Sequence, residues 1–269
     1  MTELRKKQIL RILLKNYSIS QAFSRGAEII IFENLQFKKP ILDLGCGDGT
    51  FSEILFNKSK AAVAAGVDIL PSVIELASKP RVYKDLKVAD AAKLPFEDNF
   101  FFTIISNSSL EHMDNLDNVL FEANRVLKAG GKFIFLVAHA KTEDFYIDKI
   151  ILKKLGLSSL ARKTIKLRNK ILNHRNLLDL KVWKNKLDKA GFSMEEDYYV
   201  GGGTNFGVVE FFQPTAVLSA ITKRIFGRWV LPPREPVIYF VDRFLSKYLA
   251  DKPTKTGPSL LIIARKNER

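Results

Sequence analysis

The sequence predicts an α/β protein in which helices cover both faces of a doubly wound, mostly parallel β-sheet. Short apolar runs, typical of buried strands, alternate with segments of helical periodicity between residues 41 and 138. Three glycines, Gly45, Gly47 and Gly49, follow the first apolar run and allow a sharp turn from strand to helix. With 46% apolar residues among 269, the chain can form one such domain with insertions.

The predicted elements follow one another in a regular order. Residues 1–36 are expected to form an N-terminal helical segment, because apolar residues recur there at helical spacing and Pro40 then breaks the pattern. Strands are expected at 41–44, 61–69, 86–90, 101–106 and 132–138, with a weaker signal at 194–200 and a clear late strand at 259–264. The helix expected at 117–127 would be ended by Gly130-Gly131, since glycine tolerates the left-handed conformation of a helix C-terminus.

Charge and cysteine content narrow the partners and the compartment. The formal net charge is +14, which favours acidic partners such as phosphates, nucleic acid or an anionic membrane, or serves only to keep the protein soluble. The single cysteine, Cys46, excludes an internal disulfide and a zinc site built on cysteine pairs. A chain without disulfides fits the cytoplasm, and no metal is expected.

Three successive strand ends carry residues suited to a nucleoside-like ligand. The glycine turn after Asp43 leaves bare backbone against which a ligand can lie. Asp68 ends the second strand 25 positions later, a spacing at which an acid can accept both hydroxyls of a ribose. Asp90 ends the third strand, where a carboxylate can accept from an adenine amine. Because these strand ends meet at one edge of a parallel sheet, they predict one site, although Asp43 and Asp68 could alternatively only cap turns or helices.

Together these motifs resemble the class I S-adenosylmethionine-dependent methyltransferases, in particular the small-molecule branch similar to the ubiquinone/menaquinone-biosynthesis methyltransferases. The resemblance covers residues 38–138, and weaker matches follow at 187–192 and 260–265. It rests on the stretches 41–49, 66–69, 88–91, 94–101, 106–112 and 122–132. It implies a Rossmann-like methyltransferase fold with seven strands, helical insertions after strands five and six, and S-adenosylmethionine as the methyl donor.

The resemblance also implies roles for single residues. Its cofactor-binding set is Asp43, Gly45, Gly47, Asp68, Ile69, Asp90, Ala91, Ser106 and Asn107. Gly45 and Gly47 would line the methionine part of the cofactor, Asp43 would orient it through water and its amino group, and Asp68 would bind the ribose hydroxyls. Asp90 would meet the adenine amine, and Ile69 and Ala91 would enclose the adenine ring. Ser106 and Asn107 would lie near the sulfonium.

Histidines are the candidates for a general base. Methyl transfer is an in-line displacement in which the protein supplies alignment and, for an acceptor that must lose a proton, a base. His112 and His139 both follow strands at the cofactor edge, although His112 could instead pack beside its loop. His174 lies in a basic segment and fits a solvated helix position. Cys46 stands between glycines, where a small side chain is needed rather than a nucleophile.

The main domain is expected to cover 37–269, with insertions at 141–175 and 201–258 that could form a lid over the acceptor. Across 141–190 there are fourteen Lys or Arg and five Asp or Glu, a local net charge of +9. The second insertion is apolar and aromatic. Its aromatic residues include Phe206, Phe211, Phe212, Phe226, Trp229, Tyr239, Phe240, Phe244 and Tyr248. Apolar faces beside cations are typical of interfacial membrane elements, although the same helices could simply cover the sheet edge or a dimer contact.

These features favour methyl transfer to an oxygen or carbon of a small-molecule or lipid-linked acceptor, met through peripheral contact with an anionic membrane. The sequence after the fourth strand reads Ser106-Asn-Ser-Ser, without the N/D-P-P-Y/F motif of amino-methylating nucleic-acid enzymes. An RNA methyltransferase that uses the basic 141–190 region is a second hypothesis, disfavoured because few aromatic residues are available there for base stacking. A non-catalytic S-adenosylmethionine-binding protein is a third.

Overall fold

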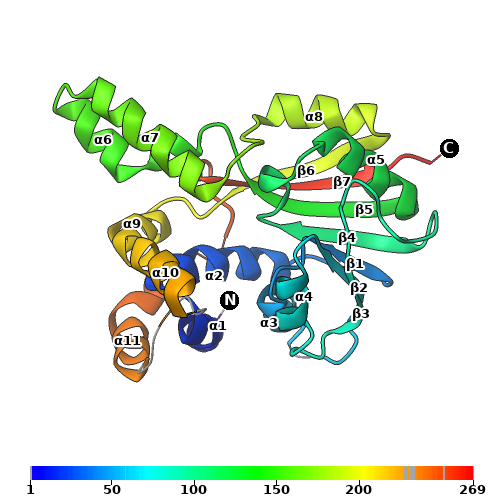
Figure 1. The fold of residues 1–269 in the computed structure, drawn as a ribbon, viewed down its shortest axis with the longest axis horizontal. Helices are drawn as coiled ribbons and strands as arrows, with labels where there is room; N and C mark the ends of the chain where they lie inside the picture. Colours follow the sequence, from blue (N-terminus) through cyan, green and yellow to red (C-terminus); the bar gives the residue numbers. More distant parts are fainter. Residues whose placement is uncertain (1, 58, 227–229, 231–233, 251, 269) are drawn as a thin grey trace. The chain divides into compact units, whose positions relative to one another are not determined.

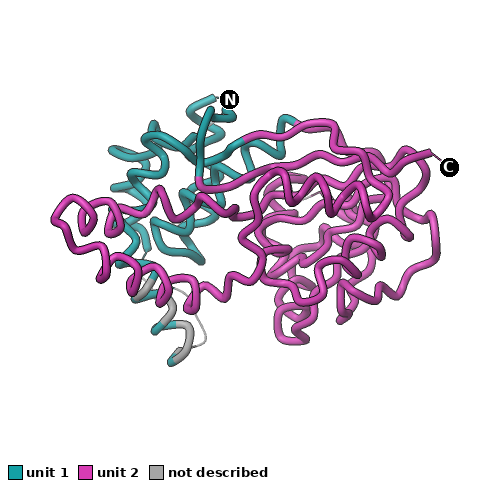
Figure 2. Tube along the Cα trace, turned by 90° about the horizontal axis from the view of Figure 1, so that it is seen from above, with its two compact units in different colours: residues 1–34, 199–257 teal, residues 35–198, 258–269 magenta. Residues whose placement is uncertain are grey.

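A computed structural model describes residues 2–57, 59–226, 230, 234–250 and 252–268. The chain forms two compact units, each built from two separate stretches of sequence (Figure 2). Unit 1 comprises residues 1–34 and 199–257, and unit 2 comprises residues 35–198 and 258–269. Unit 2 carries the sheet, whereas unit 1 is mainly helical.

The sheet of unit 2 has seven strands in the order β3-β2-β1-β4-β5-β7-β6 (Figure 1). The strands are β1 (Ile41–Leu44), β2 (Val63–Asp68), β3 (Tyr83–Val88), β4 (Phe101–Asn107), β5 (Leu127–Ala138), β6 (Phe192–Val200) and β7 (Ser259–Lys266). Strands β1 to β5 pair in parallel, and β7 pairs antiparallel with β5. The predicted seven-stranded, mostly parallel sheet with helices around it is therefore confirmed. Strand order reverses at β1, where open α/β sheets bind their ligands.

Helices of unit 2 pack on the sheet through apolar side chains. They are α3 (Thr50–Leu55), α4 (Pro71–Ala77), α5 (Leu116–Val126) and α8 (Leu180–Lys189). Unit 2 also contains the helices α6 (Ile147–Lys154) and α7 (Ser158–Leu172), which extend away from the sheet (Figure 1), and the 3-10 turns η1 (Leu110–His112) and η2 (Thr142–Phe145). Trp183 of α8 is completely buried, with its ring 5.0 Å from that of Phe135 in β5. All four residues of β1 are buried, as expected of a central strand covered on both faces.

Two details of the sheet differ from the sequence prediction. The third strand covers Tyr83–Val88, so Asp90 stands two residues beyond its end. The pair Gly130-Gly131 lies inside β5 and does not end the preceding helix, which stops at Val126. The glycines serve an irregular stretch of the sheet: Gly130 has φ +68°, and a Cβ on Gly131 would lie 2.8 Å from the Lys128 carbonyl oxygen.

Unit 1 joins the N-terminal helices to the segment between β6 and β7. Its elements are α1 (Glu3–Asn16), α2 (Ile19–Glu33), α9 (Thr204–Phe211), α10 (Gln213–Phe226) and α11 (Glu235–Phe240), followed by a π-helical turn η3 (Val241–Leu245) and a 3-10 turn η4 (Ser246–Tyr248). Ser18 and Gln21 form a capping box that starts α2. The Lys6 ammonium donates to the Leu249 carbonyl oxygen at 2.9 Å and ties α1 to the second stretch. Trp229 lies outside the described residues.

No helix in the described part of the chain combines the length and the apolar character needed to cross a bilayer.

Candidate active site

The turn after β1 is built from glycines in the left-handed conformation. Gly45, Gly47 and Gly49 have φ values of +74°, +57° and +78°. The amides of Gly45 and Cys46 both donate to the Val67 carbonyl oxygen at 2.9 Å, which fixes the turn to β2. A Cβ on Gly45 would lie 2.6 Å from Ser109 Oγ, whereas a Cβ on Gly47 would meet no atom within 4 Å. Gly45 is therefore needed for packing, and open space lies over the backbone at Gly47.

Asp68 stands against this turn at the end of β2. Its Oδ2 accepts from the Gly47 amide at 3.2 Å, and its Oδ1 accepts from the Leu70 amide at 3.1 Å. Each carboxylate oxygen can accept more than one hydrogen bond, so the group keeps capacity for a ligand hydroxyl. The next residue, Ile69, is 62% exposed and presents an apolar side chain beside the carboxylate.

The loop after β3 lies next to the end of β2. The Ala89 amide donates to the Asp68 carbonyl oxygen at 3.0 Å, and Asp90 is the next residue along the chain. The Asp90 carboxylate is exposed, and its Oδ1 accepts from the Ala92 amide at 2.9 Å. Ala91 between them is buried. The turn at Gly47 and the loop that bears Asp90 therefore both contact Asp68 at the end of β2.

Asp43 lies beneath the turn in a buried network of hydroxyl groups. Its Oδ2 accepts from Ser52 Oγ at 2.6 Å and from the Tyr83 hydroxyl at 2.7 Å, so β1, α3 and β3 are joined through one carboxylate. Burial raises the Asp43 pKa to about 6, although both hydroxyl groups lower it in part. Asp43 therefore holds the turn in place from below. Its predicted role in orienting the methionine part of the cofactor stays a prediction.

The end of β4 supports the turn from the other side. Ser106 is completely buried, and its hydroxyl donates to the Leu44 carbonyl oxygen at 2.8 Å. Any contribution of Ser106 to ligand binding would therefore come from its backbone. Asn107 follows it, half-buried, at the last position of the strand. Ser109 donates to the Gly45 carbonyl oxygen at 3.0 Å, a supporting contact that no sequence pattern indicates.

Of the two predicted bases, His112 has the more suitable hydrogen bonding. Its Nδ1 faces the Asn173 carbonyl oxygen at 3.1 Å, so Nδ1 donates and Nε2 carries the lone pair of the neutral ring. The ring stacks on His174 with centroids 5.4 Å apart. Burial lowers the pKa of His112, and burial together with the nearby His112 and Arg168 side chains lowers the pKa of His174 to about 4. Both imidazoles are therefore neutral at neutral pH.

His139 is arranged differently. It is 4% exposed, and its Nδ1 accepts from the Lys141 amide at 3.2 Å, which places the proton of the neutral ring on Nε2. Its own amide donates to Thr142 Oγ at 2.9 Å. The ring therefore stabilises the turn after β5 and has no basic nitrogen to offer. His139 as a catalytic residue finds no support in this geometry.

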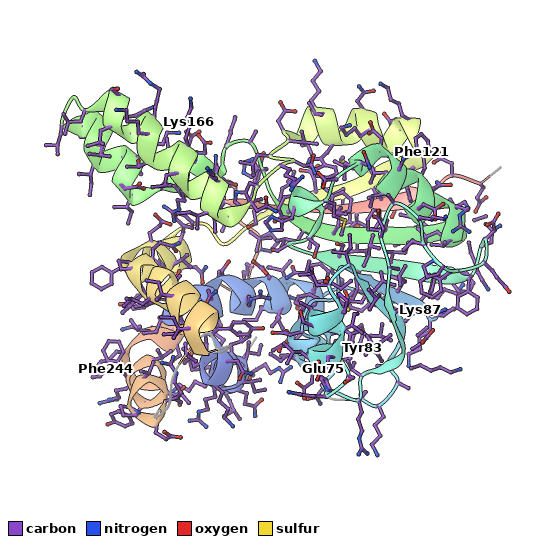
Figure 3. All side chains as sticks on the ribbon, in the orientation of Figure 1. Glu75, Tyr83, Lys87, Phe121, Lys166 and Phe244 are labelled. Atoms are coloured by element: carbon purple, nitrogen blue, oxygen red, sulfur yellow. The ribbon has the colours of Figure 1, made fainter. Side chains whose placement is uncertain are left out.

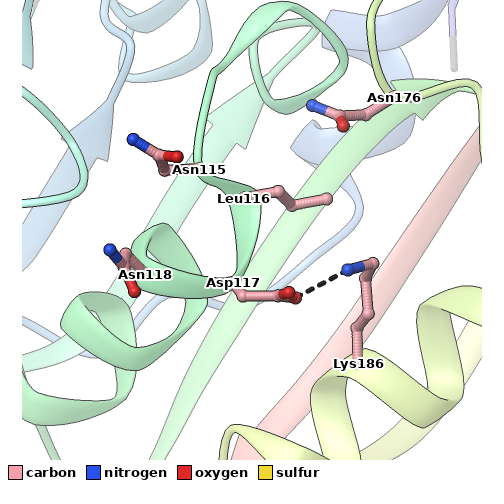
Figure 4. Close-up of a pocket in the computed structure, with 6 residues that line it drawn as sticks. All are labelled: Asn115, Leu116, Asp117, Asn118, Asn176 and Lys186. Carbon is pink, nitrogen blue, oxygen red and sulfur yellow. Dashed lines mark hydrogen bonds and ion pairs between the residues drawn. The ribbon is translucent and has the colours of Figure 1, made fainter.

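Two other features lie apart from the edge site. A pocket between the start of α5 and α8 is crossed by the ion pair of Asp117 with Lys186, at 2.6 Å (Figure 4). None of the predicted site residues lines it. Cys46 is buried, and burial raises its thiol pKa well above the ordinary value, so a nucleophilic thiolate is disfavoured as expected. The described residues contain no cluster of three or more potential metal-ligating His, Cys, Asp or Glu side chains.

The fold and this edge site are similar to those of S-adenosylmethionine-dependent methyltransferases. Residues 42–135 match the family described as "Methyltransferase domain". The chain is 32% identical over 140 residues to a malonyl-[acyl-carrier protein] O-methyltransferase of Legionella pneumophila, covering 45% of this chain and 49% of that protein. It is 35% identical over 98 residues to a ubiquinone/menaquinone biosynthesis C-methyltransferase of Desulfotalea psychrophila, covering 36% and 40%. The chain thus spans about half the length of such curated relatives, or less.

Solved structures agree with this assignment at the level of the fold. An S-adenosylmethionine-dependent methyltransferase of Thermotoga maritima, described as a possible histamine N-methyltransferase, aligns with a TM-score of 0.59 and 18% identity. That alignment covers 92% of this chain and 91% of the other. A geranyl diphosphate C-methyltransferase of Streptomyces coelicolor, solved with S-adenosylhomocysteine, aligns with a TM-score of 0.53 and 13% identity over 90% and 76% of the two chains.

The residues at the edge fit S-adenosylmethionine, the cofactor of this family. Open space lies over Gly47, where a side chain would otherwise stand between backbone and ligand. A carboxylate suited to paired hydroxyls, Asp68, is fixed beside this space, and the exposed Ile69 offers an apolar surface for a flat ring.

Proposed function

We propose that unit 2 transfers the methyl group of S-adenosylmethionine to an oxygen or carbon of a small-molecule acceptor. The hydrogen bond from the Gly47 amide to Asp68 carries this proposal, because it joins the bare turn and the ribose-binding acid into one site. The loop that bears Asp90 completes the site through its contact with the Asp68 carbonyl oxygen. Neither motif alone would specify a nucleoside ligand.

Each residue of the site has a separate role in binding the cofactor or in proton transfer. When bound, S-adenosylmethionine supplies a methyl group activated for in-line displacement. Asp68 accepts the ribose hydroxyls, Ile69 and Ala91 enclose the adenine, and Asp90 accepts from its amine. Where the acceptor is a hydroxyl group, His112 takes its proton at Nε2, the nitrogen left basic by the Asn173 contact.

The acceptor is proposed to be small and at least partly apolar. The relatives are named for malonyl-[acyl-carrier protein], for sterols and for ubiquinone or menaquinone biosynthesis, which are carrier-linked or lipid acceptors. Unit 1 supports an apolar acceptor or a lipid surface, because Phe211, Tyr239 and Phe244 are each more than half exposed (Phe244 in Figure 3). We therefore propose a cytoplasmic protein that meets a lipid-linked or amphipathic acceptor at the membrane surface.

Calorimetric titration with S-adenosylmethionine tests the cofactor site. Asp68→Ala removes two acceptor oxygens and should weaken binding by about one to two orders of magnitude, the effect of losing hydrogen bonds to a charged group. Asp85→Ala, which removes an exposed carboxylate from β3, is the matched control and should bind as the wild type does. Unchanged affinity in a folded Asp68→Ala variant would refute the assignment.

Radiolabelled methyl transfer to separate fractions of lipids, glycans, RNA and small metabolites tests the acceptor class. Label in the lipid or metabolite fraction is the expected result. Label confined to RNA would favour the RNA methyltransferase hypothesis, with the basic 141–190 region as its phosphate-binding surface. Cofactor that binds but is never converted with any fraction would favour a non-catalytic protein.

A further inference from the structure

We propose that the hairpin of α6 and α7 is a docking element for anionic lipid bilayers. The proposal deepens the function above, since it rests on the lipid-linked or amphipathic acceptor proposed there. It concerns residues 147–172, which lie wholly within unit 2 and extend away from the sheet (Figure 1). Three observations carry it: the anchoring of the hairpin, its exposed apolar side chains and its exposed cations.

The base of the hairpin is fixed by specific contacts. Lys149 pairs with Asp144 at 2.8 Å, and Arg168 pairs with Asp148 at 3.4 Å while its guanidinium lies 3.7 Å from the centre of the Tyr146 ring. Ala161 and Ile165 of α7 are buried, whereas α6 has no buried residue. The two helices are thus held in a defined arrangement, and most of their surface faces outward.

That outward surface is unusually apolar for solvent-exposed helices. The large aliphatic side chains that are at least 38% exposed are Ile147, Ile150, Ile151, Leu155, Leu157, Leu160, Leu167, Ile171 and Leu172. On α7, Leu160, Leu167 and Ile171 are spaced by seven and four residues and therefore share one face of the helix. At the tip of the hairpin, Leu155 and Leu157 flank a glycine and are 66% and 47% exposed. An apolar stripe that continues to the tip suits shallow insertion into a lipid surface.

Cations stand directly beside this stripe. Lys163, Lys166 and Lys170 follow one another by three and four residues on the neighbouring face of α7, and Lys166 is labelled in Figure 3. The exposed cations of the hairpin without a carboxylate within 4.0 Å, among the described residues, are Lys153, Lys154, Arg162, Lys163, Lys166 and Lys170. Asp148 is the single acid between 147 and 172, so this stretch carries a net charge of +7.

The combination identifies the partner by its chemistry. An apolar protein surface would cover the leucines but would leave the cations without counter-charges. RNA would pair with the cations but would leave the aliphatic stripe exposed, and the hairpin has no aromatic residue for base stacking. A bilayer that contains anionic headgroups satisfies both, because acyl chains accept the aliphatic stripe while headgroup phosphates meet the lysines.

Vesicle flotation of the full chain tests the proposal. Vesicles of phosphatidylcholine with 30% phosphatidylglycerol, at low salt, should bind the wild type, and pure phosphatidylcholine should bind it weakly. The triple variant Lys163→Gln/Lys166→Gln/Lys170→Gln should bind about a hundredfold more weakly, since each lysine near the surface contributes about fivefold. Leu155→Ser/Leu167→Ser should weaken binding at unchanged charge. The matched control Leu76→Ser/Lys84→Gln alters an exposed leucine and lysine of unit 2 outside the hairpin and should bind as the wild type does.

Several outcomes would overturn the proposal. They are the absence of binding to anionic vesicles, hairpin variants that bind as the wild type does, and loss of binding caused only by Phe244→Ser in unit 1. A hairpin variant that changes the molar mass measured by light scattering without changing lipid binding would assign the surface to a second copy of the chain. Calorimetry with S-adenosylmethionine on the same variants keeps the two hypotheses separate: weak cofactor binding by every form would refute the methyltransferase function and leave the lipid result standing.

Discussion

Replacing Asp43 with asparagine should remove a defined part of the pH dependence of unfolding. The pKa of this buried carboxyl is raised from 3.8 to about 6, so between these values the folded chain keeps a proton that the unfolded chain releases. The stability that depends on this proton is fully present below pH 3.8 and is lost as the pH rises through about 6. The shift of about two pKa units corresponds to on the order of 3 kcal/mol in the free energy of unfolding.

Urea unfolding at a series of pH values from 3.5 to 7.5 measures this effect. Asparagine keeps the volume of the side chain and one oxygen that can accept from Ser52 or Tyr83, so the variant should fold. As the pH rises across this range, the wild type should lose on the order of 3 kcal/mol of unfolding free energy relative to Asp43→Asn. Asp85→Asn, which changes an exposed carboxyl on the adjoining strand β3, should show no such shift. A constant difference at all pH values would refute the reasoning.

Three further predictions follow from the same contacts. Gly45→Ala should destabilise the turn, because its Cβ would lie 2.6 Å from Ser109 Oγ, whereas Gly47→Ala should fold and instead weaken cofactor affinity; thermal unfolding and calorimetry distinguish the two. Trp183→Ala should lower the free energy of unfolding by about 3–5 kcal/mol in urea, since a fully buried ring is lost. His112→Gln should slow methylation of a hydroxyl acceptor by about 10²–10⁴-fold at unchanged cofactor affinity. Because burial lowers the His112 pKa below 6.5, the wild-type rate should level off by about pH 7, and a rate still rising above that would indicate another base.

The sequence predicted the central part of the sheet because that part depends on local patterns. The run at 41–44 became β1, and the strand at 101–106 became β4 with one added residue. Glycine spacing and an acid at a strand end likewise predicted that Gly47 and Asp68 lie close together, since the topology of a parallel sheet brings strand ends together.

Contacts between distant residues could not be predicted in this way. Ser52 and Tyr83 meet Asp43 from 9 and 40 positions away, and no spacing pattern announces a hydroxyl that turns toward a buried carboxylate. Ser109 supports the turn across 64 positions for the same reason. A glycine with a positive φ suits both a helix end and an irregular strand, so the sequence pattern could not assign Gly130 to either. The pairing of β5 with β4 places it in the strand.

The position of β7 has a consequence for folding during synthesis. This strand lies between β5 and β6, yet its residues 259–266 are translated after both neighbours and after the second stretch of unit 1. Strand β6 can therefore not join the sheet until more than fifty later residues have left the ribosome. Helices α1 and α2 likewise wait for partners made about 170 residues later. Apolar surfaces of both units remain uncovered for most of translation, a situation in which chaperones protect nascent chains.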